Sequence, residues 1–415
     1  MRIDTPIDCW LVRPGARRRT RPMVVRLAPL LIDGAWLPPA WLARLTIGLR
    51  QIGRGQVMEF GMFHEFPSLP GRSESEAFDE AMEQVDAAER LGLDVMWLAE
   101  LHFEPRRSLL SAPLSIASAI AARTKRIKVG IAVQVLPLCH PLRLAEEAAT
   151  VDQLSHGRLI FGVGRSGVAQ TYEAYGVSYA ESQARFREIL EVIQHAWTEP
   201  TFSYQGIYHS FKNVSLVPKP YQKPTPPIRI AASTPDTFPA IGRRGLPAFA
   251  SVRHTSWSDL AGQIRNYHDA WEAAGHSGRG QVFVSAPTYI AETEARARSE
   301  PQESIMHFYR EQANLLEGAA KLVDSVTAER RMRRVHDLRG RSYEDAVHAN
   351  VLIGTPDTIA AKLTALQAEI GLSGILAELN CGGLIPHRQV VGAMKLLCEE
   401  VMPRFSSADG AARRP

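Results

Sequence analysis

The stretch "WLAELHFEP" (97–105) places a histidine between two carboxylates, with Glu100 and Glu104 on either side of His102. An imidazole held by a carboxylate can donate and accept protons near neutral pH, which is the chemistry of acid–base catalysis. The alternative is a histidine that is satisfied by local hydrogen bonds and takes no part in chemistry. Because the stretch closes an apolar run, we expect it at the end of a buried strand.

Two other stretches have the residue types of a phosphate site. "FGVGRSG" (161–167) places Arg165 after glycines, which let a ligand approach the backbone, and arginine grips phosphate through paired N–H donors. "AASTPDT" (231–237) carries the hydroxyls of Ser233, Thr234 and Thr237 around a helix start. Each stretch has a structural alternative, since Ser and Thr are common helix caps and arginine is common on surfaces. Together they predict a phosphate-binding rim.

Other chemistries are disfavoured by what the motifs lack. There is no HxH or HExxH pattern and no clustered carboxylate pair, so we expect no metal site. "GRSG" (164–167) lacks the GxSxG spacing of a serine nucleophile. The four cysteines are scattered, at Cys9, Cys139, Cys381 and Cys398. In a chain of this length they indicate free thiols in a reducing compartment rather than a disulfide framework.

The segments around these residues alternate between strand-like and helix-like patterns. The chain has 415 residues, of which 45% are hydrophobic, enough for a large buried core. Eight apolar or alternating runs predict strands at 57–66, 93–99, 126–137, 158–164, 227–233, 245–252, 281–291 and 373–380. With helical patterns between them, they predict one α/β domain, a (β/α)8 TIM barrel with insertions. An open doubly wound sheet is the alternative, although no GxGxxG follows the first strand.

In such a barrel the chemistry lies at the carboxyl ends of the strands, so the strand ends supply the candidate residues. The ends carry His64 and Glu65, Glu100 and His102, Gln134, Arg165 and Ser166, Ser233 and Thr234, His254, and Asn380. The "WLAELHFEP" stretch is the second of these ends, which favours a functional interpretation of it.

Three regions fall outside the regular alternation. Residues 1–57 hold ten Arg, three Asp and no Lys or Glu, a net charge of +7, and the rest of the chain therefore sums to −3. The body thus gives no support to nucleic-acid binding. We expect 1–57 to be a loosely ordered extension, with a transit peptide as the alternative. We expect 58–405 to be the barrel with a lid insertion at about 292–350, and 406–415 to be a disordered tail. No apolar run is long enough to span a membrane, and we expect a cytoplasmic protein.

Over nearly all of residues 58–405 the sequence resembles the bacterial-luciferase-like flavin-dependent monooxygenases. "GLDVMWLAELHF" (92–103) is similar to the family's second-strand segment, which typically ends in Glu-His-His-Phe. The run from "KVGIAVQVLP" to "GVGRSG" (128–167) is similar to the stretch that follows in the family. "GLP" (245–247), "IGTPDT" (353–358) and "AMKLLCEEVMP" (393–403) complete the series. The ordered series, rather than any one motif, makes the resemblance specific.

The resemblance implies a barrel that binds reduced FMN against a non-prolyl cis peptide after the third strand, which here would be Ala132–Val133. It implies that Arg165, with Thr234 and Thr237, holds the FMN phosphate. Reduced FMN would activate oxygen for attack on an aldehyde or similar substrate, while the protein positions the reactants and excludes water. The residues expected at the cofactor are Ala132, Val133, Gln134, Arg165, Ser233, Thr234 and Thr237.

The chain departs from the family at three positions. Leu101 replaces the first histidine of Glu-His-His-Phe, which is a catalytic base in the light-emitting enzymes, and leucine cannot transfer a proton. Ser233 stands where luciferases have a glutamate, and Gly164 where they have a cysteine. We therefore expect His102 with Glu100, or His64 across the barrel, to serve as the catalytic groups.

The predicted function is a two-component monooxygenase that uses reduced FMN and O2 on an aldehyde, ketone or sulfonate. A separate flavin reductase would supply the flavin, because no nicotinamide-binding domain is recognisable. A deazaflavin-dependent dehydrogenase or reductase of the same superfamily, and a non-catalytic flavin-binding barrel, are the alternatives. We expect a homodimer, because helix 111–124 is rich in small residues that permit close packing.

Overall fold

The computed structural model describes residues 8–9, 23–24, 57–67, 71–253 and 255–406. Most of the arginine-rich segment, His254 and the tail beyond 406 therefore lie outside the described residues. Within the N-terminal unit, β1 (Asp8–Cys9) pairs antiparallel with β2 (Met23–Val24). The second unit begins at Gly55 and contains the barrel.

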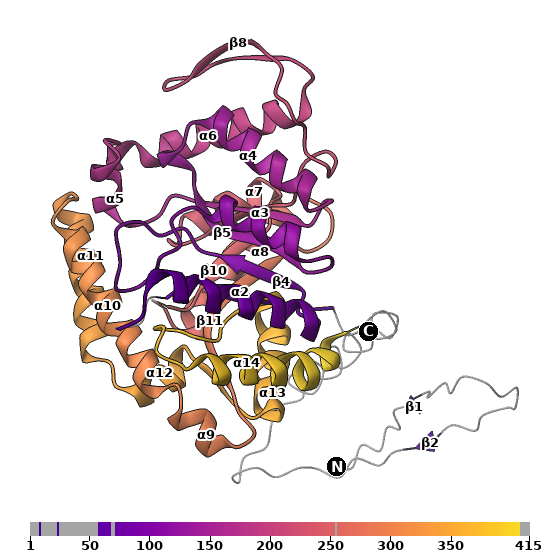
Figure 1. Cartoon of the computed structure of the whole chain (residues 1–415), viewed down its shortest axis with the longest axis vertical. Helices are drawn as coiled ribbons and strands as arrows, with labels where there is room; N and C mark the ends of the chain where they lie inside the picture. Colours follow the sequence, from indigo (N-terminus) through magenta and orange to yellow (C-terminus); the bar gives the residue numbers. More distant parts are fainter. Residues whose placement is uncertain (1–7, 10–22, 25–56, 68–70, 254, 407–415) are drawn as a thin grey trace, which may run out of the picture. The chain divides into compact units, whose positions relative to one another are not determined.

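Eight parallel strands form a closed barrel (Figure 1). They are β3 (Glu59–His64), β4 (Val95–Leu98), β5 (Lys128–Val135), β6 (Leu159–Gly164), β9 (Ile228–Ala231), β10 (Ala248–Ser251), β11 (Val282–Ile290) and β13 (Leu372–Glu378). Each pairs with its neighbours in this order, and β13 returns to pair with β3. This closure confirms the predicted (β/α)8 barrel, because the strands of an open sheet do not return to the first one.

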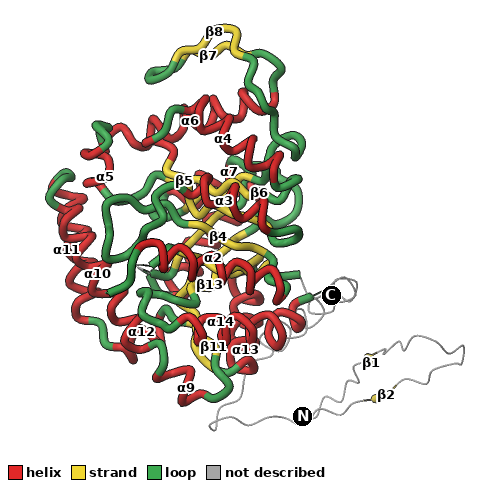
Figure 2. The backbone as a smooth tube through the Cα atoms, in the orientation of Figure 1, coloured by secondary structure: helices red, strands yellow, loops and turns green. Residues whose placement is uncertain are grey.

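Helices surround the strands, and their ends follow from local sequence (Figure 2). The outer helices are α2 (Glu74–Leu91), α3 (Pro113–Arg123), α4 (Pro141–Leu154), α6 (Ser182–Thr198), α7 (Thr237–Arg243), α8 (Trp257–Ala273), α13 (Pro356–Ile370) and α14 (His387–Leu396). Helix α2 begins in a reciprocal capping box between Ser73 and Glu76 and ends at Gly92, whose φ of 88° is left-handed. Short turns add η1 (Leu136–Leu138), η2 (Tyr179–Glu181), a π-helical turn η3 (Leu397–Val401) and η4 (Met402–Phe405).

Three additions extend the barrel. After β6 comes the short helix α5 (Ala169–Ala174), and between α6 and β9 lies a hairpin of β7 (Phe202–Gln205) and β8 (Ser210–Val214). The 292–350 insertion is helical throughout, as α9 (Glu294–Ser299), α10 (Gln302–Ala320), α11 (Ser325–Gly340) and α12 (Tyr343–Ala349). In Figure 1 these helices lie along one side of the barrel.

One strand differs from the sequence-based prediction. β12 (Leu352–Gly354) pairs with the far end of β11, in a stretch where the sequence predicts no strand. The helix begins only at Pro356, where Thr355 caps it. Three residues are too few to show strand alternation, so pairing with β11 is what defines this strand.

The barrel interior is closed at the amino ends of the strands. Trp97 fills the centre so tightly that a Cβ at Gly61 or Gly130 would lie 2.3 or 2.1 Å from its ring. Below it, buried Arg229 stacks 3.5 Å from the Phe283 ring centroid and makes two hydrogen bonds to Glu59. The open end of the barrel is therefore the one at the carboxyl ends of the strands.

Candidate functional site

A cavity of about 760 Å³ lies at the carboxyl ends of the strands. Its walls come from the ends of β3 to β6, from the segment after β9, and from the lid helices α10 and α11. Among the residues predicted at the cofactor, those that line it are Ala132, Val133, Arg165, Ser233, Thr234 and Thr237; Glu100 and Leu101 line it as well. Of the strand-end candidates, Glu65, Glu100, Arg165, Ser166, Ser233 and Thr234 line the cavity, whereas Gln134 and His102 do not.

The peptide bond between Ala132 and Val133 is cis and lies in this wall. This confirms the bond that the family resemblance implied. Gln134 follows it, with its side-chain nitrogen donating to Glu100 at 2.6 Å. The Gln134 Oε1 atom is buried and, within the described part of the chain, has no hydrogen-bond partner. Gln134 does not itself line the cavity, and its side chain acts on the wall by holding Glu100.

The donors of a phosphate site follow the next strands, β6 and β9. Arg165 is half-buried, and its Nη1 donates to Ser182 Oγ at 2.9 Å, with no carboxylate paired to it in the described residues. The Thr237 hydroxyl donates to the Thr234 carbonyl at 2.6 Å and accepts from the Thr234 N–H at 3.2 Å. The Thr237 hydroxyl thus closes the turn at the start of α7, whose N-cap residue Asp236 makes no side-chain cap hydrogen bond, and both threonines line the cavity. The residues fit a phosphate-bearing flavin.

Glu100 and His102 are joined in a hydrogen-bonded chain. Glu100 Oε1 lies 2.8 Å from His102 Nε2, while its Oε2 accepts from Gln134 and from the Val135 N–H at 2.6 and 2.7 Å. His102 Nδ1 lies 3.2 Å from the Tyr175 hydroxyl. Burial and the Glu100 charge raise the pKa of Tyr175. Glu100 lines the cavity, His102 is buried behind it, and Tyr175 is 47% exposed, so the chain connects the cavity with solvent.

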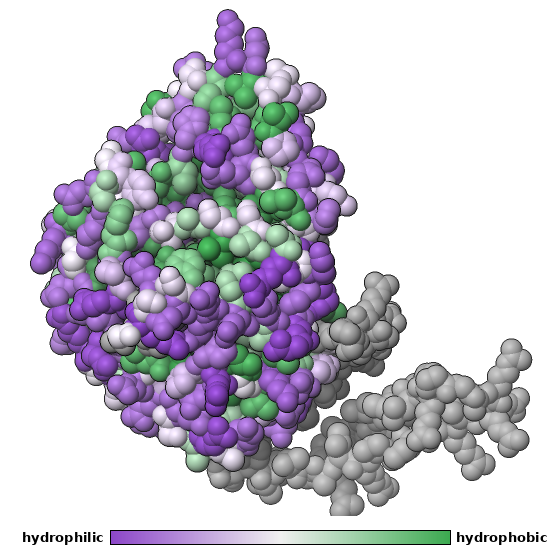
Figure 3. Space-filling model, in the orientation of Figure 1, coloured by the Kyte–Doolittle hydropathy of each residue, from purple (hydrophilic) through white to green (hydrophobic). Residues whose placement is uncertain are grey.

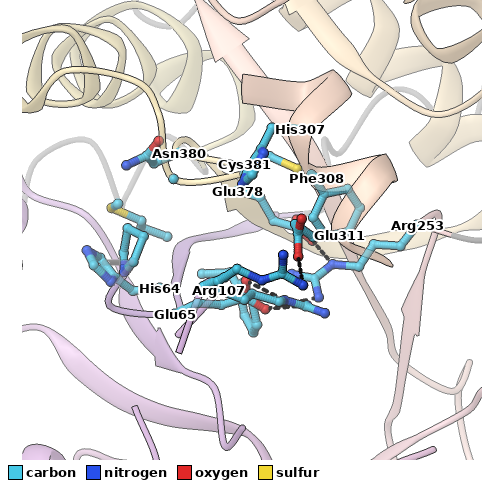
Figure 4. Close-up of a pocket in the computed structure, with 16 residues that line it drawn as sticks. His64, Glu65, Arg107, Arg253, His307, Phe308, Glu311, Glu378, Asn380 and Cys381 are labelled. Atoms are coloured by element: carbon cyan, nitrogen blue, oxygen red, sulfur yellow. Dashed lines mark hydrogen bonds and ion pairs between the residues drawn. The ribbon is translucent and has the colours of Figure 1, made fainter. Parts of the chain in front are cut away.

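The structure does not bring His64 to this cavity. Its Nε2 lies 3.0 Å from Gln84 Oε1 on α2, and its Nδ1 accepts from the Phe66 N–H at 2.9 Å, so both ring nitrogens are engaged. Burial lowers the pKa of His64 to about 4. His64 lines a separate small cavity of about 30 Å³ (Figure 4).

A cluster of four charged residues, here called the Glu65 cluster, lies beside that small cavity (Figure 4). Arg107 donates to both Glu65 oxygens, at 3.2 and 2.7 Å, and Arg253 donates to Glu65 at 3.2 Å and to Glu378 at 2.8 Å. Although burial opposes ionisation, the two arginines lower the pKa of Glu65 to about 2. Burial would lower the pKa of Arg253, but the two carboxylates raise it.

Sequence reasoning named Glu65 only as a strand end and missed its partners. Arg107, Arg253 and Glu378 are 42 to 188 residues from the groups they bind, a separation that no local pattern encodes. Glu378 ends β13, so extending the strand-end rule to every charged residue would have found it. Tyr175 was missed too, because its contact with His102 joins residues 73 positions apart, which spacing does not encode.

Residues 58–373 match the sequence model of the family described as "Luciferase-like monooxygenase". The chain belongs to this family. The oxygenase component of flavin-dependent trigonelline monooxygenase from Acinetobacter baylyi is 24% identical over 361 residues, covering 85% of this chain and 96% of that relative. The family, the barrel and the enzyme class predicted from the sequence, a flavin-dependent monooxygenase, are confirmed.

Solved structures agree on the fold of this family member. The oxygenating constituent of 3,6-diketocamphane monooxygenase from Pseudomonas putida, in complex with FMN, matches with a TM-score of 0.70 and 22% identity, covering 85% of this chain and 99% of that one. The coenzyme F420-dependent tetrahydromethanopterin reductase of Methanopyrus kandleri matches with a TM-score of 0.64 and 20% identity, covering 84% and 100%. At these identities the likeness shows the barrel alone.

Proposed function

We propose that the protein is the oxygenase of a two-component system that uses reduced FMN and O2 to oxidise a small organic substrate. The observation that carries the proposal is the convergence on one cavity of the Ala132–Val133 cis bond, Arg165 and the hydroxyls before α7. These are the groups the family resemblance implies for the flavin ring and its phosphate. The A. baylyi relative is an oxygenase component, which supports a separate reductase.

The residues of the wall divide the work of binding. Arg165, Ser233, Thr234 and Thr237 hold the phosphate by charge and hydrogen bonds, while Ala132 and Val133 support the ring. When bound, reduced FMN supplies the electrons that activate oxygen. The apolar wall, which includes Leu101, Leu315 and Leu316, keeps water away from the reacting atoms.

Proton supply is assigned to the chain Glu100–His102–Tyr175. Glu100 faces the cavity and is held in place by Gln134 and the Val135 N–H, so its position is fixed before any ligand binds. His102 connects it to Tyr175, and the exposed Tyr175 ring connects the pair to solvent. This arrangement supplies a proton route that does not need the histidine replaced by Leu101.

The first test follows flavin oxidation by stopped-flow absorbance. Anaerobic protein with reduced FMN is mixed with oxygenated buffer. We expect flavin oxidation much slower than that of free reduced FMN, with a distinct transient absorbance. Oxidation at the rate of the free flavin refutes oxygen activation. Tight binding of a reduced deazaflavin in that case would point to the dehydrogenase alternative, whereas flavin binding with no turnover of aldehydes, ketones or sulfonates would point to a non-catalytic barrel.

A second test addresses the proton route. We expect His102→Ala to lower kcat by about a hundredfold, the lower range for general acid–base catalysis, and to leave the Kd of reduced FMN unchanged. Tyr175→Phe, which keeps the ring, should lower kcat less and shift the pH–rate profile. His140→Ala is the matched control, since His140 is exposed and lies outside the cavity wall. Equal kcat values in His102→Ala and wild type would remove His102 from the mechanism.

The proposal extends to assembly and location. On α3, the small residues Ser115, Ala119 and Ala122 are exposed, so this face is available for packing against a second copy. We propose a cytoplasmic homodimer, to be tested by light scattering. None of the helices in the described part of the chain combines the length and apolarity needed to cross a membrane.

A further inference from the structure

Helix α11 carries arginines on two faces, and the two faces differ in their partners. Arg333 and Arg339 lie outside the cavity wall, and each pairs with a carboxylate, Glu329 and Glu317 respectively. Arg330, Arg331 and Arg334, here called the α11 arginines, line the cavity instead. Within the described part of the chain none of these three pairs with a carboxylate. A helix that simply used arginine for solubility would show the same pairing on both faces.

The α11 arginines are close enough to repel one another. Arg334 is half-buried, and burial together with the charges of Arg330 and Arg331 lowers its pKa. Like charges one turn apart destabilise a helix, and desolvation adds to the cost. The cost is relieved when an anion lies between the guanidinium groups, because each then gains charge-assisted hydrogen bonds.

A phosphate at Arg165 leaves most of this charge uncompensated. The cavity wall contains nine arginines and two glutamates, with no lysine or aspartate, and Glu378 pairs with Arg253 from outside the wall, which leaves a formal charge of +6. A phosphate monoester contributes only about −2 near neutral pH. Arg187 on α6 also lines the cavity and is exposed, without a carboxylate partner among the described residues, whereas Arg185 on the same helix is half-buried and pairs with Glu181. The excess is thus concentrated on the cavity side.

Arg331 connects helix α11 to the segment that carries Arg165. It donates to the Ala319 carbonyl at 2.6 Å and to the Tyr179 hydroxyl at 2.9 Å. Tyr179 packs edge-on against Tyr172 at 5.1 Å, and the Tyr172 hydroxyl donates to the Arg165 carbonyl. The side chain of Arg331 is therefore an anchor, while Arg330 and Arg334 keep their donors for a ligand. Hydrophilic side chains cover most of the region of α11 in Figure 3.

We propose that Arg330 and Arg334 bind a second oxyanion, a carboxylate, sulfonate or phosphate, in addition to the phosphate held at Arg165. The inference rests on the proposed function, because that phosphate is assigned to FMN. The second anion belongs either to an acidic substrate or to an acidic extension of the cofactor, and both sources share the same chemistry. Its position on the lid couples anion binding to the placement of α11 over the cavity.

The test compares Arg330→Gln/Arg334→Gln with a matched control, Arg333→Gln/Arg339→Gln. Both double variants remove two positive charges from the same helix, but only the first removes them from the cavity wall. Inorganic phosphate is titrated at constant ionic strength into anaerobic full-length protein saturated with reduced FMN, and binding is followed by the rise in Tm. We expect phosphate to bind wild type and the control equally, and to bind Arg330→Gln/Arg334→Gln at least about tenfold more weakly.

Two results would overturn the proposal. One is a failure of the phosphate titration to distinguish the variants, either because wild type and Arg330→Gln/Arg334→Gln bind phosphate equally or because FMN-saturated wild type binds none. The other is a loss of reduced FMN affinity in Arg330→Gln/Arg334→Gln as large as in Arg165→Gln, which would assign the α11 arginines to the flavin phosphate itself. Failure of wild type to bind reduced FMN at all would refute the proposed function instead, and the phosphate titration without flavin would still report on Arg330 and Arg334.

The source of the anion is found with the same variants. If it is a substrate, Arg330→Gln/Arg334→Gln raises KM for acidic substrates and leaves KM for neutral ones and the Kd of reduced FMN unchanged. If it is a cofactor extension, the double variant weakens binding of a reduced deazaflavin with an acidic tail while reduced FMN binds as before. Either result supports a second oxyanion site.

Discussion

Arginines stand on two sides of the cavity, and they differ in what they face. On the side of β3 and β13, Arg107 and Arg253 meet Glu65 and Glu378. On the side of β6, Arg165 and the α11 arginines meet no carboxylate in the described residues. An arginine that pairs with a carboxylate of the protein contributes to folding stability. An arginine at a cavity without such a partner keeps its N–H donors free to bind an anionic ligand. Partner chemistry, rather than residue type, therefore separates structural charge from binding charge.

The largest expected effect on folding stability comes from removing an arginine that pairs with buried carboxylates. Arg253→Met keeps much of the side-chain volume but leaves Glu378, whose side chain is 3% exposed, without its cation. Removing one partner of a buried ion pair typically costs about 3–5 kcal/mol, and we expect a loss of this size in the free energy of unfolding, measured with urea. Arg333→Met, at a solvent-facing pair, should change it by less than about 1 kcal/mol. Similar values for the two variants would contradict the distinction.

A somewhat smaller effect is expected from acidification, through His64 beside the Glu65 cluster. Its folded-state pKa of about 4 lies below the unfolded value of 6.5, so between these values the unfolded chain binds more protons. The contribution of neutral His64 to stability is therefore complete above pH 6.5 and is lost as pH falls towards 4, by up to about 3 kcal/mol. Urea unfolding across this window should show a shallower pH dependence in His64→Gln, and parallel curves would exclude His64 as the cause.

The smallest effect on folding stability is expected for Arg165, which has no carboxylate partner in the described residues. Its replacement should instead weaken the binding of reduced FMN. Arg165→Gln removes a charge that no carboxylate balances, so folding stability should be nearly unchanged. Binding of reduced FMN should weaken by about tenfold or more, the worth of a charge-assisted hydrogen bond to phosphate. Binding of reduced riboflavin, which lacks the phosphate, should not change. A large loss of stability in Arg165→Gln would place Arg165 among the structural charges.

The sequence predicted what local patterns encode, and the reasons for its limits are physical. Apolar runs and caps located the eight barrel strands, and the motif series located the cis bond to the residue. Strand β12 was missed because three residues carry no periodicity, and the partners of Glu65 because ion pairs form between distant segments. The run "RRMRR" (330–334) shows that this segment is positively charged, but the sequence does not show which of its arginines line the cavity. That depends on how α11 packs onto α10. Glu100 and Glu104 set His102 apart in the sequence, but only the structure shows that Gln84 and the Phe66 N–H engage both ring nitrogens of His64.

The close approach of Gly164 to Val133 has a consequence for how this site can vary among relatives. A Cβ at position 164 would lie 2.4 Å from Val133 Cγ2, and a β-branched side chain has few rotamers with which to move away. The two positions are thus constrained as a pair: a chain with a side chain at 164, such as the cysteine of luciferases, needs a smaller residue at 133. The order of substitution matters for the same reason: reducing Val133 first leaves room for a side chain at 164, whereas enlarging Gly164 first creates the clash.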